Sequence, residues 1–216
     1  MDIFEIMKAR HSVRQYSGKK IESEKKQTLV DLVKECNRES GLNIQIIFNE
    51  PKCFNSMMAH YGKFSGVENY IALVGKKGAN LEEKAGYYGE KLVLKAQELG
   101  LNTCWVAMTH GKSAAEIKRG EKLACIIALG YGTTQGVAHK NKPVEQFCNC
   151  AAAMPDWFSK GMEAVLLAPT ARNQQKFYFT LENEKVSAKA GKGFYAKMDL
   201  GIVKYHFEAA TGRKVE

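Results

Sequence analysis

The chain has 216 residues, which suits one compact domain with a core large enough to fold without disulfides or bound metal. Its composition, 45% hydrophobic and 25% charged, is that of a soluble globular protein. No apolar run reaches the length of a membrane span. The first residues include acids and lack the apolar stretch of a signal peptide. We therefore expect a cytoplasmic protein that does not bind membranes.

The formal net charge is +9, and a basic protein attracts any polyanion, nucleic acid included, without specificity. The lysines are scattered and stand beside glutamates, as in KKIESEKK at 19–26. Such a pattern is typical of a solvated surface of mixed charge, although it also favours small phosphorylated ligands. We expect no nucleic-acid partner.

Taken in chain order, the patterns predict helices that alternate with strands. The first elements are a short helix over 2–9 and a longer one over 22–38, which has apolar residues at helical spacing and ends at Gly41. The later strands are predicted over 43–50, 69–75, 102–108, 123–132, 176–182 and 185–189, with a turn at Asn183-Glu184, and the later helices over 82–99, 156–167 and 198–211. This order predicts a layered α/β or α+β domain, and since no linker interrupts it, a single domain over 1–216.

This order of elements contains a weak internal repeat, which we call the echo. Each part contains a helix, a strand and a closing helix, and both closing helices follow the pattern Gly-x₁₀-Gly, at 89–100 and 201–212. We interpret the echo as two half-units, about 1–150 and 151–216, related by a pseudo-twofold axis as in a homodimer.

Two polar segments stand out against this background. Arg10, Ser12 and Arg14 would share one face of an extended segment, and two guanidiniums with a hydroxyl suit an anion such as phosphate. A solvated basic turn would have the same composition. The second segment, residues 169–175, interrupts an apolar helix and a strand, so its amides need partners from protein or from a ligand.

Four motifs together resemble those of the nitroreductase family of flavoproteins. They are RHSVRQY at 10–16, ELGLNTCW at 98–105, ALGY at 128–131 with HKNKP at 139–143, and APTARNQQKFYF at 168–179. The resemblance implies an α+β nitroreductase-like fold with a central mixed or antiparallel sheet flanked by helices.

The order of these motifs departs from that of ordinary members, where the APS segment follows the first signature by one helix. In the family's homodimer, one subunit supplies the R-x-S signature to a flavin at the interface and the other supplies the APS segment. The resemblance, closest to a short subfamily with the present order, therefore implies a fused pseudo-dimer. We expect one FMN per chain, and a monomer or weak homodimer.

The resemblance also implies the residues that would surround FMN. The phosphate and the pyrimidine edge would be contacted by Arg10, His11, Ser12 and Arg14, with Lys140 and Lys142 as further phosphate partners. The surroundings of N5 would be formed by Thr103, Cys104 and Trp105. The ring would be contacted by Pro169, Thr170, Ala171 and Asn173. The family usually has an arginine where these two lysines stand. Cys104 and Trp105 fit plain core packing equally well.

In this family the flavin carries the chemistry, so no catalytic side chain is expected. Hydride passes from NADH or NADPH to flavin N5 and then to a nitroaromatic, quinone or similar acceptor. Arg10 or Arg14 near N1 would stabilise the reduced anionic flavin.

Two other functions stay open at this point: a flavin-binding carrier or sensor without turnover, and a basic nucleic-acid or metal-binding module. The pair Cys148 and Cys150 lacks further ligands at suitable spacing, so we expect no metal and six ordinary reduced thiols. The glycine-rich stretch GYGTTQG at 130–136 lacks a phosphate-loop pattern and is interpreted as a turn.

Overall fold

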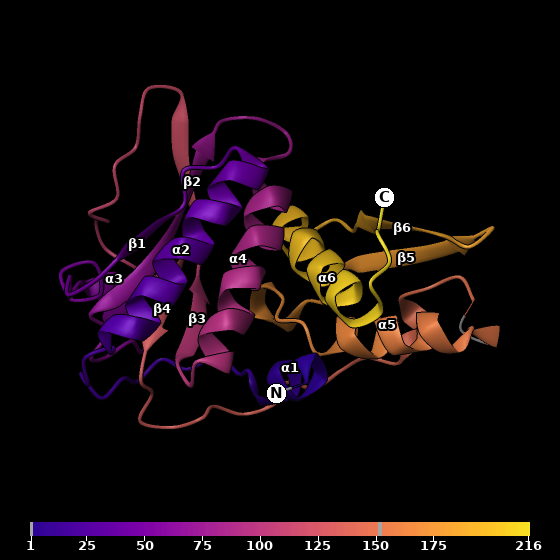
Figure 1. Ribbon diagram of the computed structural model, residues 1–216, viewed down its shortest axis with the longest axis horizontal. Coiled ribbons are helices and arrows are strands. Elements are labelled where there is room, and N and C mark those ends of the chain that lie inside the picture. Colours follow the sequence, from indigo (N-terminus) through magenta and orange to yellow (C-terminus); the bar gives the residue numbers. More distant parts are fainter. Residues whose placement is uncertain (1, 151–152) are drawn as a thin grey trace. The chain divides into compact units, whose positions relative to one another are not determined.

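The structure, a computed structural model, describes residues 2–150 and 153–216. The chain divides into two compact units (Figure 1). The sheet unit comprises Ala9–Leu81 and Lys91–Val137, and the hairpin unit comprises Met1–Lys8, Glu82–Glu90 and Ala138–Glu216. The boundary predicted near residue 151 falls on residues outside the described ones, and the half-units and their pseudo-twofold axis stay predictions.

The sheet unit is built on four antiparallel strands. They are β1 (Gln45–Ile47), β2 (Asn69–Lys76), β3 (Asn102–Val106) and β4 (Glu121–Gly130), in the order β1-β2-β4-β3. Strand β2 is buried over its whole length except at its last residue, as its unbroken apolar run predicts. Strand β2 is therefore covered on both of its faces.

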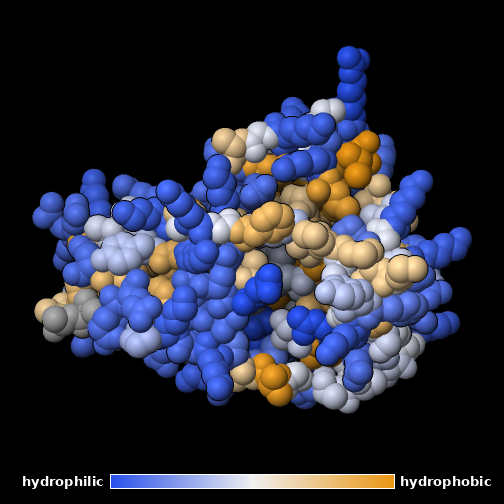
Figure 2. All heavy atoms as spheres, turned by 180° about the vertical axis from the view of Figure 1, so that it is seen from behind, coloured by the Kyte–Doolittle hydropathy of each residue, from blue (hydrophilic) through white to orange (hydrophobic). Residues whose placement is uncertain are grey.

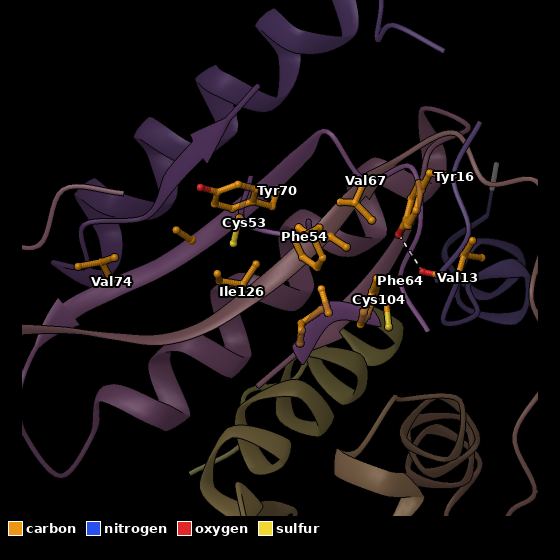
Figure 3. Close-up of a cluster of buried hydrophobic side chains, with 14 residues drawn as sticks. Val13, Tyr16, Cys53, Phe54, Phe64, Val67, Tyr70, Val74, Cys104 and Ile126 are labelled. Atoms are coloured by element: carbon orange, nitrogen blue, oxygen red, sulfur yellow. Dashed lines mark hydrogen bonds between the residues drawn. The ribbon is translucent and has the colours of Figure 1, made fainter. Parts of the chain in front are cut away.

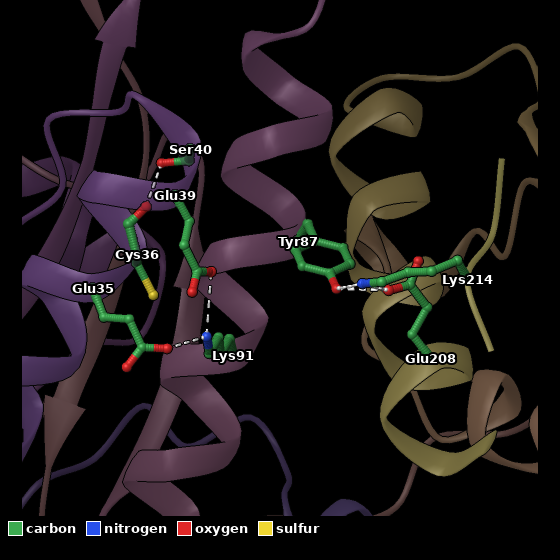
Figure 4. A network of polar contacts seen from close by, with 8 residues as sticks. All are labelled: Glu35, Cys36, Glu39, Ser40, Tyr87, Lys91, Glu208 and Lys214. Atoms are coloured by element: carbon green, nitrogen blue, oxygen red, sulfur yellow. Dashed lines mark hydrogen bonds and ion pairs between the residues drawn. The ribbon is translucent and has the colours of Figure 1, made fainter. Parts of the chain in front are cut away.

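Two helices of the sheet unit are joined by an ion pair. Helix α2 (Ser23–Ser40) ends at Gly41, which adopts a left-handed φ of 71° and donates its N–H to the Asn37 carbonyl. Helix α4 (Leu81–Glu98) contributes its first residue and its part from Lys91 onward to this unit. The Lys91 ammonium lies 2.7 Å from Glu35 and 3.5 Å from Glu39 of α2 (Figure 4).

A cluster of buried side chains packs on one face of the sheet (Figure 3). Phe54 makes an edge-on contact with Phe64 at 5.2 Å between ring centroids. The segment between β1 and β2, which includes helix α3 (Met57–Tyr61), supplies several members of the cluster. Cys104 of β3 belongs to it as well, so this core reaches the strand that carries candidate site residues.

The hairpin unit combines helices with a two-stranded sheet. Its elements are α1 (Ile3–Ala9, whose last residue is assigned to the sheet unit), α5 (Asp156–Leu166), β5 (Phe177–Glu182), β6 (Lys185–Ala190) and α6 (Ala196–Thr211). Asn183 and Glu184 form the predicted turn with φ values of 50° and 62°, which suits a tight hairpin. Helix α5 approaches α6 so closely that a Cβ on Gly161 would lie 2.3 Å from the Phe207 ring.

The predicted elements are confirmed, with differences at their ends. The strand predicted over 43–50 is shorter, because Asn49 adopts a left-handed φ of 55° that interrupts an extended backbone. Two short 3₁₀ helices, Val144–Gln146 and Ala171–Asn173, were not predicted. None of the described helices is both long and apolar enough to cross a membrane. The face seen in Figure 2 carries mainly hydrophilic residues, with hydrophobic ones in small patches.

A fully buried polar pair joins α4 to α6 within the hairpin unit. The His206 Nε2 atom lies 2.9 Å from Glu90 Oε1, and its Nδ1 atom lies 2.9 Å from the Ala164 carbonyl. A carbonyl only accepts, so Nδ1 carries a proton and donates to it. Nε2 and the carboxyl group then share one further proton, and breaking such a buried pair leaves a polar group unsatisfied.

We predict that Glu90→Ala lowers the free energy of unfolding by about 3–5 kcal/mol, because it removes the partner of the buried His206 Nε2 atom. Glu90→Gln should cost about 1 kcal/mol, since its amide can donate to an unprotonated Nε2 while Nδ1 keeps its bond to Ala164. Urea unfolding of both variants checks this. Equal losses for the two substitutions would contradict the hydrogen-bond assignment.

Candidate functional site

The first candidate segment is an extended stretch held at the edge of the sheet unit. Its N–H groups donate to three separate parts of the chain: Val13 to the Thr103 carbonyl at 3.0 Å, Tyr16 to Ser65 at 2.9 Å and Ser17 to Tyr131 at 2.8 Å. Ser12 also forms an isolated parallel β-bridge with Thr103. The local hydrogen bonding of this stretch is therefore completed by long-range contacts, which fixes where its side chains lie.

Arg10, Ser12 and Arg14 converge near the thiol of Cys104. Burial raises the pKa of this thiol, while the charges of Arg14 and Arg10 and a hydrogen bond with Ser12 act in the opposite direction. Arg10 is 3% exposed, whereas Arg14 is exposed to solvent. One guanidinium therefore lies inside the protein and the other at its surface, and the shared face stays a prediction.

Tyr16 completes this corner of the core, although sequence reasoning did not include it among the candidates. Its hydroxyl donates to the Val13 carbonyl at 2.9 Å (Figure 3). Burial and the neighbouring Cys104 raise the pKa of Tyr16, and Arg14 opposes the shift. The aromatic position of the RHSVRQY motif was the available signal.

The glycine-rich stretch 130–136 also makes backbone contacts with the extended segment. Gly132 forms an isolated antiparallel β-bridge with Tyr16, and the Thr133 N–H donates to the Gln15 carbonyl at 2.9 Å. At Gly136, with a φ of 73°, an added Cβ would lie 2.8 Å from His11 Cβ and 3.0 Å from the Ser12 carbonyl oxygen. The interpretation of 130–136 as a simple turn therefore missed its role, which is to let two backbones approach closely.

Thr103 and Trp105 occupy the strand that borders these residues. Thr103 is buried and pairs with Leu129, while Trp105 is half-buried and pairs with Ile127. Side chains alternate along a strand, so Cys104 faces the cluster of Figure 3 and its two neighbours face the opposite side. Thr103 contacts the arginine-bearing segment through its backbone, and Cys104 lies near the same segment through its thiol.

The net positive charge is concentrated in the sheet unit. This unit holds 18 of the 32 lysines and arginines but only 10 of the 23 aspartates and glutamates. The hairpin unit, with 14 basic and 13 acidic residues, is nearly neutral. The excess cations therefore lie in the unit that carries Arg10 and Arg14, where an anionic ligand would be favoured.

The second candidate segment, residues 169–175, lies in the hairpin unit and finds protein partners for its amides. Asn173 donates from Nδ2 to the Lys140 carbonyl at 2.8 Å, and Gln175 donates to the same carbonyl at 2.9 Å. Gln175 also accepts from the Lys142 N–H at 3.1 Å. Lys140 and Lys142 thus meet the polar loop through their backbones.

The ammonium of Lys142 donates to the Gln174 carbonyl at 3.1 Å, while the exposed side chain of Lys140 extends from the same strip of chain. Pro169, Thr170 and Ala171 are half-buried at the start of the loop. The Thr170 hydroxyl accepts from the Gln175 N–H at 3.1 Å and so closes the loop on itself. The hairpin-unit candidates therefore form one connected group.

Asp199 of α6 anchors this loop, and sequence reasoning did not identify it. Its two carboxylate oxygens accept from the Ala171 N–H at 2.9 Å and from Gln174 Nε2 at 2.7 Å. Burial raises the pKa of Asp199 to about 6, although both hydrogen bonds act to lower it. An aspartate next to apolar residues in the helix predicted over 198–211 was the available signal.

The fold and the clustered motifs define a protein of the nitroreductase type, and comparisons with known proteins agree. A family model described as "Putative TM nitroreductase" matches residues 2–211. A crystal structure of a "putative nitroreductase" from Thermotoga maritima is 24% identical, with a TM-score of 0.72, and covers 97% of this chain and 83% of that chain. The chain belongs to the nitroreductase family, which confirms the prediction from its motifs.

Two more distant structures share the fold. One, from Desulfovibrio desulfuricans, is described as a "putative nitroreductase in complex with fmn" and is 15% identical, with a TM-score of 0.54 over 67% of this chain and 94% of that chain. The other is a nitroreductase family protein from Streptococcus pneumoniae, 16% identical, with a TM-score of 0.54 over 67% and 98%. The predicted α+β class with an antiparallel sheet is confirmed. The search of curated proteins found no match.

We predict that Gly136→Ala destabilises the protein more than Gly120→Ala. Both glycines have a left-handed φ, but a Cβ at Gly120 meets nothing within 4 Å. Gly120→Ala should cost about 1 kcal/mol of unfolding free energy from backbone strain alone, and Gly136→Ala about 1–3 kcal/mol more from overpacking. Chemical denaturation of the pair measures the difference, and equal costs would show that the close approach at His11 is absent.

We predict a pH-dependent stability that depends on Asp199. Because its folded pKa is raised, its stabilising contribution is complete below the unfolded pKa and is lost as the pH rises through about 6. The free energy of unfolding, relative to that of Asp199→Asn, should fall by up to about 3 kcal/mol between about pH 4 and 7. Denaturant titrations across this range test it, and parallel pH profiles for the two proteins would refute it.

Proposed function

We propose that this protein is an FMN-dependent NAD(P)H oxidoreductase. The observation that carries the proposal is the convergence of Arg10, Ser12 and Arg14 near Cys104 in the most basic part of a nitroreductase-family chain. A relative of the same fold, from Desulfovibrio desulfuricans, is described in complex with FMN. The donor set fits FMN, because guanidiniums and a hydroxyl are the groups that bind a phosphate and the polar edge of an isoalloxazine ring.

The residues of the sheet unit would hold the cofactor by charge and hydrogen bonding. Arg14, being exposed, keeps its five donors available at the surface, and Arg10 supplies a second positive charge from within. His11 and Ser12 lie between them. Thr103, Cys104 and Trp105 would border the ring, with Cys104 fixed in the core rather than acting as a nucleophile, since burial raises the pKa of its thiol.

A second group of proposed flavin contacts lies within the hairpin unit and is assigned by the family resemblance. Pro169, Thr170, Ala171 and Asn173 would border the ring, and Lys140 and Lys142 would supplement the phosphate partners. Both polar atoms of the Asn173 amide have protein partners, because Nδ2 donates to the Lys140 carbonyl and Oδ1 accepts from Gln175. Within this loop the contacts to a ligand would therefore come mainly from backbone groups and from Thr170.

When bound, FMN supplies the hydride-transfer chemistry, between NADH or NADPH and a small acceptor such as a nitroaromatic or quinone. The chain's own residues bind and orient, and none is assigned as a catalytic acid or base. A guanidinium beside the ring, from Arg10 or Arg14, would stabilise negative charge there. We propose a monomer or weak homodimer that binds neither membrane nor nucleic acid. A carrier or sensor that binds flavin without turnover is the alternative.

The visible spectrum of the purified protein, followed by addition of NADH or NADPH, tests this function. We expect flavin absorption that bleaches rapidly under anaerobic conditions and returns on addition of a quinone or nitroaromatic. A flavin band that reduced nicotinamide leaves unchanged would support the carrier or sensor instead. Failure of the protein to bind added FMN would overturn both functions.

For the cofactor site itself, we predict that Arg14→Ala raises the Kd for FMN roughly ten- to hundred-fold, the loss expected for one charge-assisted hydrogen bond to phosphate. Arg38→Ala is the matched control, because it removes the same charge from an exposed position on α2. Titration of the apoproteins with FMN, followed by quenching of flavin fluorescence, gives both constants. Equal constants for the two variants would remove Arg14 from the site.

A further inference from the structure

Cys148 and Cys150 form a contacting pair of thiols in the hairpin unit. They are separated by one residue, and Cys150 lies close enough to Cys148 to affect the pKa of its thiol through both its side chain and its backbone. The Cys148 thiol also lies 3.8 Å from the Val144 carbonyl. The two sulfur atoms are therefore already neighbours in the folded chain, without any movement of distant elements.

Solvent exposure distinguishes the two members of this pair. None of the six cysteines, all of which lie in the described part of the chain, forms a disulfide, and five of them, Cys148 included, are buried. Cys150 is the sixth and is partly exposed. Burial raises the pKa of the Cys148 thiol, so Cys150 is the sulfur that a reagent from solvent would reach first.

The backbone around the pair is fixed by the hairpin. Asn149, which lies between the two cysteines, exchanges hydrogen bonds with Leu181: its Oδ1 accepts from the Leu181 N–H at 2.9 Å and its Nδ2 donates to the Leu181 carbonyl at 3.2 Å. Just before the pair, the Phe147 carbonyl accepts from the Phe179 N–H at 2.7 Å. These hydrogen bonds to β5 fix the backbone on which the two cysteines stand, which lowers the entropic cost of joining their sulfur atoms.

We propose that Cys148 and Cys150 are a redox-active dithiol, a site that low-molecular-weight disulfides such as oxidised glutathione convert into an intrachain disulfide. The Cys150 thiolate attacks one sulfur of oxidised glutathione, forms a mixed disulfide and releases one glutathione thiol. The Cys148 thiolate then attacks the Cys150 sulfur and releases the second. Two electrons pass from the cysteine pair to the glutathione disulfide, and the two cysteine protons leave with the released thiols.

A disulfide between residues so close in sequence is strained and partly exposed, and such bonds are readily reduced. The site is therefore reversible rather than a structural cross-link. The proposal is independent of FMN, because it depends only on the two thiols and the chain segment that carries them.

The test exposes the purified protein to oxidised glutathione, quenches with acid, blocks remaining thiols under denaturing conditions and digests with trypsin. Cleavage after Lys140 and Lys160 releases residues 141–160, since Lys142 precedes a proline, and this peptide contains no other cysteine. We expect it to be unblocked and about 2 Da lighter than the reduced peptide, the loss of two hydrogens. Treatment with a reducing thiol should reverse the change.

Two variants separate the roles of the cysteines. Cys148→Ala should stop at one glutathione on Cys150, whereas Cys150→Ser should leave Cys148 unmodified. A wild-type peptide that stays fully blocked, or that retains glutathione, would overturn the proposal, as would glutathione on Cys148 in the Cys150→Ser variant. The mass of the wild-type peptide distinguishes a disulfide from two free thiols even if the Cys148→Ala variant fails to fold.

Discussion

The candidate site depends on how the chain satisfies the backbone of the extended segment after α1. An isolated extended stretch exposes its N–H and C=O groups, and burying them unpaired is costly. Here Val13, Tyr16 and Ser17 donate to three parts of the chain that lie far apart in sequence. Those hydrogen bonds hold the segment that carries Arg10, Ser12 and Arg14 beside β3.

The same constraint explains the glycines of residues 130–136. Strand β4 ends at Gly130, and the chain that follows must pass close to the extended segment, closer than a side chain at Gly136 would permit. The close approach lets the Thr133 N–H reach the Gln15 carbonyl. A glycine-rich stretch without a phosphate-loop pattern thus positions the segment that carries Arg10 and Arg14 through backbone packing.

The sequence predicted the elements well because their signals are local: apolar spacing in α2, an unbroken apolar run in β2 and a turn at Asn183-Glu184. Its expectation that alternation along an extended chain brings the two arginines to one face stays a prediction. It did not predict Asp199 or Gly136, because both act on segments distant in sequence. It left open the partners of the polar loop, which tertiary contacts with Lys140 and Asp199 decide.

That polar loop is shaped before any ligand binds. Arg172, Asn173 and Gln175 adopt left-handed φ values of 52°, 53° and 49°, each a conformation that costs a residue other than glycine roughly 1 kcal/mol or more. The buried carboxylate of Asp199 offsets this cost, because it accepts hydrogen bonds at both ends of the 3₁₀ turn. A ligand that contacts the loop therefore does not need to order it. The entropic cost of ordering the loop belongs to the free energy of folding and does not weaken the binding of the ligand.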